Sequence, residues 1–150
     1  MASGNLEMLK KTGNNKFSDE VYTPQEAVEP LLEFLPKEKV YYEATSNKSS
    51  SIVDYMREQG YNIISSEGRD FLKDPLPDFD IMITNPPYSI KDKFIARCYE
   101  INKPFALLLP VSSIQGITRG CMFNEFGIDL LVLNKRIDFT GGGSPHFGVA

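Results

Sequence analysis

The run Asp80-Ile81-Met82-Ile83-Thr84-Asn85-Pro86-Pro87-Tyr88 holds the strongest structural signal in the chain. Its first half, residues 80–84, is a short apolar run of the kind found in strands that are covered on both faces. Pro86 and Pro87 then fix two backbone angles and remove two N–H donors, so the strand is expected to end in a stiff loop. A helical apolar pattern follows over residues 89–102. The run therefore predicts a buried strand, a rigid turn and a helix in succession.

Strands and helices alternate on both sides of this run. The strands are predicted at residues 40–42, 61–64, 80–84, 105–109 and 130–133, and the helices at residues 23–35, 52–59 and 89–102. This alternation predicts an α/β sandwich with a mainly parallel sheet and helices on both faces. Ligands of such sheets gather at the carboxyl ends of the strands. We therefore expect the loops at residues 43–51, 65–70 and 85–89 to line one crevice.

Length and composition predict a single domain. The chain has 150 residues, of which 41% are hydrophobic and 24% are charged, which suffices for one ordinary core. We assign the domain to residues 19–150 and expect residues 1–18, which are polar and lack apolar periodicity, to form a flexible leader. The sequence has no run of about 18 apolar residues and no apolar signal core. The prediction is a cytoplasmic protein without a membrane span.

Metal sites and disulfides are not predicted. Cys98 and Cys121 lack the spacing of paired ligands, and His146 is the only histidine. The formal net charge of −4 argues against a broadly basic surface for nucleic acid, although local patches can still steer an anionic partner. Any contact with DNA or RNA is therefore expected to be focal or transient.

The ends of two helices carry recognisable signals. Thr23 is predicted to cap the first helix, with Pro24 at its first position and Glu26 reaching back as a capping-box partner. Gly60 is placed as the C-terminal cap of the second helix.

The stiff loop is suited to holding a planar amine. The Asn85 side-chain oxygen and the Pro86 carbonyl are natural acceptors, and two hydrogen bonds to them would turn the amine lone pair toward an electrophilic methyl group. Tyr88 offers a flat face for a base that has been extruded from its stack, and such stacking contributes about 1–3 kcal/mol. The alternative is that Pro86 and Pro87 merely end a strand, with Tyr88 packed for stability.

On this motif the sequence resembles the S-adenosylmethionine-dependent amino-methyltransferases of the adenine-N6 type. In that family Asp/Asn-Pro-Pro-Tyr/Phe is the catalytic motif after the fourth strand, and here it reads Asn85-Pro86-Pro87-Tyr88. The resemblance implies a Rossmann-like methyltransferase fold. It implies catalytic roles for Asn85, Pro86 and Tyr88, and substrate-binding roles for Pro87, Tyr88, Lys91 and Lys93.

The resemblance also implies S-adenosylmethionine as the cofactor. The residues implied to bind it are Tyr22, Thr23, Pro24, Glu43, Thr45, Glu67, Asp70, Phe71 and Asn85. Thr23 and Pro24 match the segment over the methionine end, Glu67 the acidic residue that holds the ribose hydroxyls, and Asp70 the acidic position near the adenine. Phe71 would pack beside Asp70.

Two features depart from the family pattern. Glu43 keeps the acidic position after the first strand, but no glycine follows it, so Asn47 would have to supply any positive φ in that loop. The interval between the second strand and Asp70 is too short for the usual helix and third strand. An abridged sheet is therefore expected.

The implied reaction is methyl transfer to the exocyclic N6 amine of adenine in DNA or RNA, with DNA favoured. The sequence has no separate target-recognition domain, and the cations that could contact phosphates are Arg97, Arg119, Lys135 and Arg136 besides Lys91 and Lys93. The alternative is that these side chains lie on the solvent-exposed surface and contact no nucleic acid. The loop at residues 141–146 would lie near the flipped base. Self-association is a further expectation.

Two other functions stay open. One is methylation of a glutamine side-chain amide, because similar proteins use the same loop for a planar amide. The other is a catalytically inactive binding or inhibitor module, which the glycine-free loop, the acidic charge and the small size favour.

Overall fold

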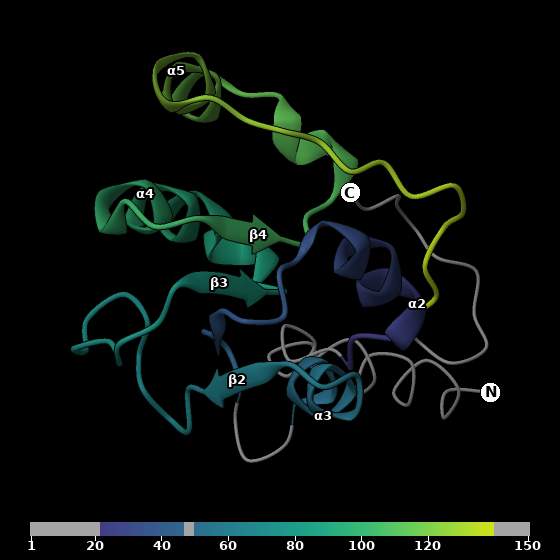
Figure 1. Ribbon diagram of the computed structural model, residues 1–150. Coiled ribbons are helices and arrows are strands. Elements are labelled where there is room, and N and C mark those ends of the chain that lie inside the picture. The colour runs from purple at the N-terminus through teal and green to yellow at the C-terminus, as the bar shows by residue number, and fades with distance from the viewer. Residues whose placement is uncertain (1–21, 47–49, 140–150) are drawn as a thin grey trace, which may run out of the picture.

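The computed structural model describes residues 22–46 and 50–139 of the chain. Its elements are α2 (Gln25–Val28), a 3-10 helix (Glu29–Phe34), β1 (Val40–Glu43), α3 (Ser51–Glu58), β2 (Asn62–Ser65), β3 (Ile81–Thr84), a 3-10 helix (Tyr88–Ile90), α4 (Lys91–Ile101), β4 (Phe105–Leu107), a 3-10 helix (Val111–Ile114) and α5 (Ile117–Phe126). The four strands are all parallel and lie in the order β2-β1-β3-β4 (Figure 1). The predicted α/β, Rossmann-like fold is confirmed in a small form.

Both faces of the sheet are buried because apolar side chains continue along its central strands. On β1, Tyr41 packs on one face and Tyr42 on the other, and both are fully buried. On β3, Ile83 shares the face of Tyr41 and Met82 shares the face of Tyr42. Alternate residues of one short run thus supply two cores, as the continuous apolar pattern predicted.

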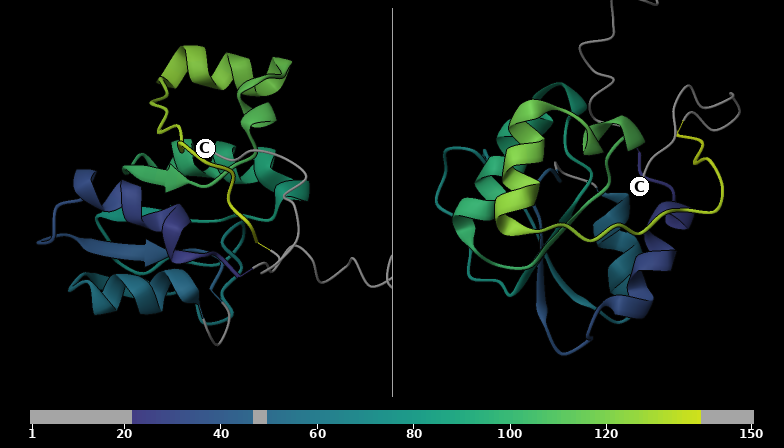
Figure 2. Two further views of the ribbon diagram at one scale, coloured as in Figure 1. Left: turned by 90° about the vertical axis from the view of Figure 1, so that its right-hand side faces the viewer. Right: turned by 90° about the horizontal axis from the view of Figure 1, so that it is seen from above.

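Helices cover the two faces unequally. Helices α2 and α3 lie on one side and α4 on the other (Figure 2, right-hand view). Between β2 and β3 residues 66–80 form no helix, and they bring Phe71 and Phe79 into the core on the side of α4. Phe71 stacks on Phe94 of α4 with ring centroids 4.9 Å apart, and Phe79 stacks on Tyr42 at 5.2 Å. Aromatic side chains of a loop thus replace a covering helix, which explains how the abridged sheet stays buried.

Helix α3 lies within one residue of its predicted bounds at each end. It begins after Ser50, whose hydroxyl accepts a hydrogen bond from the backbone N–H of Val53 at 3.3 Å. Gly60 follows its end with φ +85°, and the Gly60 N–H donates to the carbonyl of Arg57 at 2.9 Å. The left-handed conformation favours glycine, so the predicted C-terminal cap is confirmed. The helix buries the side chains of Ile52, Val53, Tyr55 and Met56.

The predicted capping box of the first helix is wrong. Pro24 is the N-cap of α2, and no side chain caps this helix. The Thr23 hydroxyl instead accepts a hydrogen bond from the side chain of Asn85, and Glu26 pairs with Lys135 at 2.6 Å. The side chains of Thr23 and Glu26, which the local pattern had assigned to the cap, therefore bind residues distant in the sequence instead.

The first helix is also shorter than predicted. Only Gln25–Val28 is α-helical, and the chain continues as the 3-10 helix Glu29–Phe34. Pro30 is the reason, because it has no N–H to donate to the carbonyl of Glu26, four residues before it. The apolar residues of this segment still pack against the core of α3 as expected.

The strand predicted at residues 130–133 is wrong. These residues belong to no strand, and the side chains of Leu130 and Val132 are exposed. An apolar run becomes a strand only where a neighbouring strand takes up its backbone groups. Helix α5, which precedes this segment, has no buried side chain and is set apart from the sheet beside α4 (Figure 1).

The described part of the chain contains no helix that is both long and apolar enough to cross a membrane. Within residues 22–46 and 50–139 no three His, Cys, Asp or Glu side chains are grouped to hold a metal ion. Cys98 is buried, Cys121 is exposed, and both thiols are free.

Tyr42 carries a buried hydroxyl without a hydrogen-bond partner among the described residues, and burial raises the pKa of this phenol. Leaving such a group unpaired destabilises the fold. Tyr42→Phe, which keeps the ring stacked on Phe79, is therefore expected to raise the free energy of unfolding by about 1 kcal/mol in urea denaturation. Tyr41→Phe is the matched control and should lower it, because the Tyr41 hydroxyl donates to the carbonyl of Pro36 at 2.7 Å. A lower free energy of unfolding in Tyr42→Phe would show that the Tyr42 hydroxyl makes a stabilising hydrogen bond.

Candidate functional site

The site lies where the strand order reverses. Strand β2 follows β1 on one side of the sheet and β4 follows β3 on the other, so the neighbours β1 and β3 form a topological switch point. Open parallel sheets bind ligands outside the carboxyl ends of the strands at such a point. Glu43 and Thr45 lie there at the end of β1, and Thr84 and Asn85 lie there at the end of β3.

Two hydrogen bonds hold Asn85, one made by its side chain and one by its backbone. Its side-chain Nδ2 donates to the Thr23 hydroxyl at 3.0 Å, and its backbone carbonyl accepts from the Thr45 hydroxyl at 3.3 Å. Its side-chain Oδ1 is buried and has no hydrogen-bond partner among the described residues. Buried acceptors are normally paired, so an orphaned oxygen at this point of the fold indicates a donor that comes from outside the described residues, such as a ligand.

A buried carboxylate lies behind Asn85. Glu43 is 1% exposed. Its Oε1 accepts from the Thr45 N–H at 3.0 Å and from the Thr84 hydroxyl at 2.5 Å, and the Thr45 hydroxyl lies 2.9 Å away. Its Oε2 accepts from the Ser50 hydroxyl at 3.1 Å. These bonds tie the end of β1 to the end of β3 and to the start of α3.

The loops after β1 and β2 are joined directly. The Ser66 N–H donates to the Ser46 hydroxyl oxygen at 2.6 Å, and the Ser66 hydroxyl donates to the Ser46 carbonyl. Serine hydrogen bonds thus join the end of β1 to the segment after β2. Asn47, which was predicted to supply any positive φ in this loop, lies outside the described residues.

The prolines and Tyr88 continue the motif into α4. Pro86 is fully buried, and Pro87 precedes the 3-10 helix Tyr88–Ile90, as expected of a stiff loop. The Tyr88 ring is partly buried and packs against Ala27 of α2 and Ile137. Burial raises the pKa of the Tyr88 phenol well above its ordinary value, so the ring stays uncharged.

The acidic residues after β2 lie at the surface. Glu67 and Asp70 are both exposed, which leaves their carboxylates open to solvent. The Leu72 N–H donates to Asp70 at 2.9 Å, and this bond holds the pKa of the Asp70 carboxyl below its ordinary value. Lys73 adds an ion pair at 3.3 Å. Phe71 is only 2% exposed and belongs to the core, so its surroundings are Phe94 and other apolar side chains.

Glu67 adopts a backbone conformation that suits it poorly. Its φ is +47° and that of Gly68 is +88°, and the Arg69 N–H closes the turn on the Ser66 carbonyl at 3.0 Å. Two consecutive positive φ values define a turn of the type I′ class, where Asn or Gly is preferred to a long side chain. Such strain is often retained where the side chain has a function.

Glu67→Asn is therefore expected to raise the free energy of unfolding by about 1 kcal/mol, because asparagine tolerates the left-handed region. Urea denaturation measures the change. Glu67→Gln is the matched control, since it also removes the carboxylate but keeps a long side chain in the same conformation. Equal stabilities of the two variants would show that the backbone at residue 67 is not strained.

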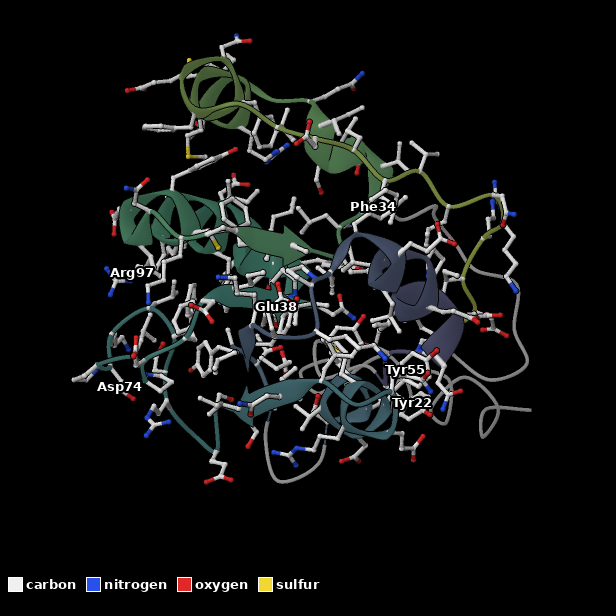
Figure 3. All side chains as sticks on the ribbon, viewed as in Figure 1. Tyr22, Phe34, Glu38, Tyr55, Asp74 and Arg97 are labelled. Atoms are coloured by element: carbon white, nitrogen blue, oxygen red, sulfur yellow. The ribbon has the colours of Figure 1, made fainter. Side chains whose placement is uncertain are left out.

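The remaining residues implied for the cofactor divide between site and surface. Thr23 is buried and joined to Asn85, while its backbone N–H donates to the Ser51 hydroxyl at 3.1 Å. Pro24 follows it as the N-cap of α2. Tyr22 is 67% exposed and, like Phe34, lies outside the core (Figure 3).

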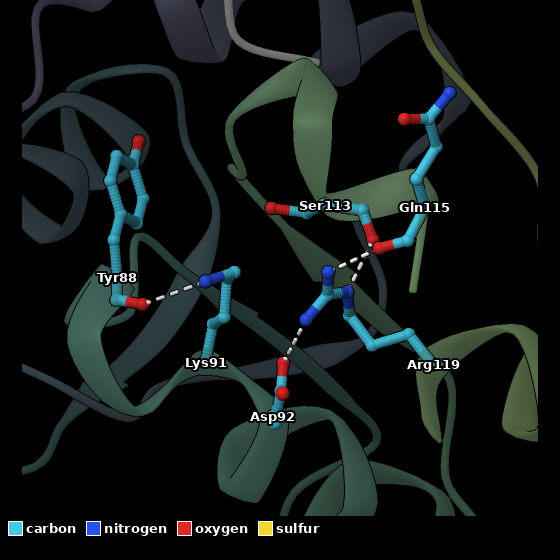
Figure 4. Close-up of polar contacts among 6 residues, drawn as sticks. All are labelled: Tyr88, Lys91, Asp92, Ser113, Gln115 and Arg119. Atoms are coloured by element: carbon cyan, nitrogen blue, oxygen red, sulfur yellow. Dashed lines mark hydrogen bonds and ion pairs between the residues drawn. The ribbon is translucent and has the colours of Figure 1, made fainter. Parts of the chain in front are cut away.

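Several of the candidate cations are bound to the protein itself. Lys91 turns back to donate to the Tyr88 carbonyl at 3.2 Å, and Arg119 reaches from α5 to Asp92 at 2.6 Å (Figure 4). Arg119 also donates to the backbone carbonyls of Ser113 and Gln115. These bonds fix local structure around the motif and α5.

The other cations lie further out. Arg97 pairs with Glu100 at 3.2 Å, and Lys135 pairs with Glu26. Lys93 and Arg136 are exposed. The loop at residues 141–146 lies outside the described residues.

The sequence did not single out Thr84 or Ser50 as site residues. Thr84 ends the buried strand and joins the Glu43 carboxylate, and Ser50 joins the same carboxylate from the start of α3. One signal was available, since a polar residue that ends a buried apolar run needs a hydrogen-bond partner. Its partner could not be named without the pairing of β1 with β3.

Comparison with known proteins adds no family to these observations. No family model matches the chain, and no curated protein matches its sequence.

Proposed function

We propose that this protein transfers a methyl group from S-adenosylmethionine to the exocyclic N6 amine of adenine in DNA. The observation that carries the proposal is the buried, unpaired Oδ1 of Asn85 at the topological switch point. An acceptor in this place fits an N–H donor of a ligand. The resemblance of Asn85-Pro86-Pro87-Tyr88 to the catalytic motif of the amino-methyltransferases supports the same chemistry.

The residues of the motif have separate roles in this proposal. Asn85 Oδ1 and the Pro86 carbonyl accept the two hydrogen bonds of the amine, which orients the nitrogen lone pair toward the methyl group without a strong base. The prolines keep both oxygens in place before the substrate arrives, so that little ordering is needed during the reaction. Pro87 and Tyr88 contact the base, and Lys93 is the exposed cation nearest the motif in sequence that would meet a phosphate.

Acceptor groups in the segment after β2 suit the proposed cofactor. S-adenosylmethionine supplies an electrophilic methyl group when it is bound. The exposed carboxylate of Glu67 can accept hydrogen bonds from ribose hydroxyls, and that of Asp70 can accept from the adenine amine. Thr23 and Pro24 precede α2 and, through the bond of Thr23 to Asn85, border the same site.

The second candidate is a methyltransferase-like module that binds a partner without catalysis. The contact between Ser46 and Ser66 favours it, because two loops joined to each other by hydrogen bonds give a cofactor less backbone to approach. Methylation of a glutamine amide is a variant of the first proposal, since the same two acceptors would hold a planar amide.

Calorimetric titration with S-adenosylmethionine and with its demethylated product tests the proposal first. We expect both to bind. Transfer of a labelled methyl group to duplex DNA, single-stranded DNA, RNA and a glutamine-containing peptide then separates the substrates, with label expected on adenine N6 of DNA. Absence of heat at high micromolar ligand would favour the non-catalytic module, and label on the peptide would favour the amide substrate.

A further inference from the structure

The polar groups around Asn85 form a ring, in which each group lies within hydrogen-bond distance of the next or, for Ser50 and Ser51, is joined to it by the peptide link. From the Asn85 carbonyl the ring passes through Thr45 and Thr84 to Glu43. It continues through Ser50 and its neighbour Ser51 to Thr23, and it returns to Asn85 at Nδ2. We infer that Glu43 and Thr84 are positioning residues that hold the acceptor oxygen of Asn85, and that Glu43 is not a cofactor ligand. The inference rests on the proposed function.

The carboxylate of Glu43 has little capacity left for a ligand. Its Oε1 already lies within hydrogen-bond distance of three donor groups, and a carboxylate oxygen offers about two lone pairs. The side chain is 1% exposed, so a cofactor would have to break these bonds before reaching it. Its bonds are instead directed at the strand end that carries the motif.

The count of hydroxyl protons explains why Thr84 is needed. The Thr45 hydroxyl has one proton and lies near Glu43 Oε1 at 2.9 Å, Thr84 Oγ1 at 2.7 Å and the Asn85 carbonyl at 3.3 Å. The Thr84 proton satisfies the carboxylate at 2.5 Å, so the Thr45 proton is shared between Thr84 Oγ1 and the Asn85 carbonyl instead of being drawn to the carboxylate. Without the Thr84 hydroxyl, the Thr45 proton turns to the carboxylate, which is the stronger acceptor, and the Asn85 carbonyl is released.

The second arm of the ring fixes the Asn85 side chain. Ser50 donates to Glu43 Oε2 at 3.1 Å and caps α3, and the adjacent Ser51 hydroxyl accepts from the Thr23 N–H. Thr23 in turn accepts from Asn85 Nδ2, which leaves Oδ1 as the group turned to the substrate. One buried carboxylate therefore holds both ends of the catalytic asparagine.

Thr84→Val and Thr84→Ser in the full chain test the inference, with Thr118→Val on the exposed face of α5 as a matched control. For Thr84→Val we expect turnover to fall about tenfold or more, because the acceptor is displaced, with the Kd for S-adenosylmethionine unchanged. Thr84→Ser, which keeps the hydroxyl, should restore turnover. Thr118→Val should resemble the wild type. Equal turnover in Thr84→Val and the wild type would overturn the inference.

Hydrogen exchange of the Asn85 side-chain amide, followed by NMR, gives a readout that does not depend on activity. It should accelerate in Thr84→Val and in Glu43→Gln but not in Thr84→Ser or Thr118→Val. Glu43→Gln should also lower turnover with the Kd for S-adenosylmethionine unchanged. A higher Kd in Glu43→Gln with unchanged exchange at Asn85 would make Glu43 a cofactor ligand and overturn the inference.

The two proposals fail in different ways. If the wild type neither binds S-adenosylmethionine nor transfers a methyl group, the proposed function fails. If exchange at Asn85 is the same in Thr84→Val and the wild type, the positioning role fails whatever the activity.

Discussion

Replacing Asn85 with Ala is expected to lower the rate of methyl transfer about 100- to 1000-fold, by analogy with the removal of one preorganised polar group from an active site. The Asn85 Oδ1 is the acceptor that would orient the amine, and the nearby carboxylate of Glu43 does not lie ready to replace it, because it is buried and already accepts hydrogen bonds at both oxygens. Single-turnover transfer to DNA measures the rate. Calorimetry should show a far smaller change in the Kd for S-adenosylmethionine.

Asn85→Asp is the matched control for this substitution. It keeps an acceptor oxygen in the place of Oδ1, and the Thr23 hydroxyl can rotate to donate where it now accepts. We expect this variant to keep part of the activity that Asn85→Ala loses. Normal transfer by Asn85→Ala would show that the oxygen has no role, even in an active enzyme.

Phe71→Ala is expected to lower the free energy of unfolding by about 3–5 kcal/mol, the cost usual for a buried phenylalanine. Phe71 is a large side chain of the segment that covers the sheet in place of a helix, and it stacks on Phe94 at an interplanar angle of 26°. Its removal leaves a cavity between this segment and α4. Urea denaturation, with the midpoint and the slope fitted separately, measures the loss.

Phe34→Ala provides the control for Phe71→Ala. Phe34 is 67% exposed, so the same substitution there should change the free energy of unfolding by less than about 0.5 kcal/mol. Comparable losses in the two variants would mean that residues 66–80 do not form part of the core.

Most of the fold was predictable because its signals are local. Continuous apolar runs predicted β1 and β3, and Gly60 predicted the end of α3. The errors arose where the secondary structure of a segment depends on contacts with residues distant in the sequence. Residues 130–133 have a strand-like composition but no strand beside them to take up their backbone groups.

The candidate site was predictable only in part. The order of Thr23, Glu43 and Asn85 along the chain pointed to one region, and the structure places them in one ring of polar contacts. Thr84 was missed because its partner Glu43 lies 41 residues away, and their contact depends on the register of β1 with β3. Phe71 was assigned to the cofactor, but its burial against Phe94 could be known only from the packing.

The attachment of α5 has a consequence for how the protein unfolds. Its helix buries no side chain, and the contacts that hold it include the ring of Phe126 against Tyr99 and the Arg119–Asp92 pair. Elements held this weakly open in local fluctuations well below the free energy of the whole domain. Amide protons of α5 should therefore exchange with solvent while those of β1 and β3 stay protected. The sheet and its cores would then unfold as one cooperative unit, and α5 would open separately.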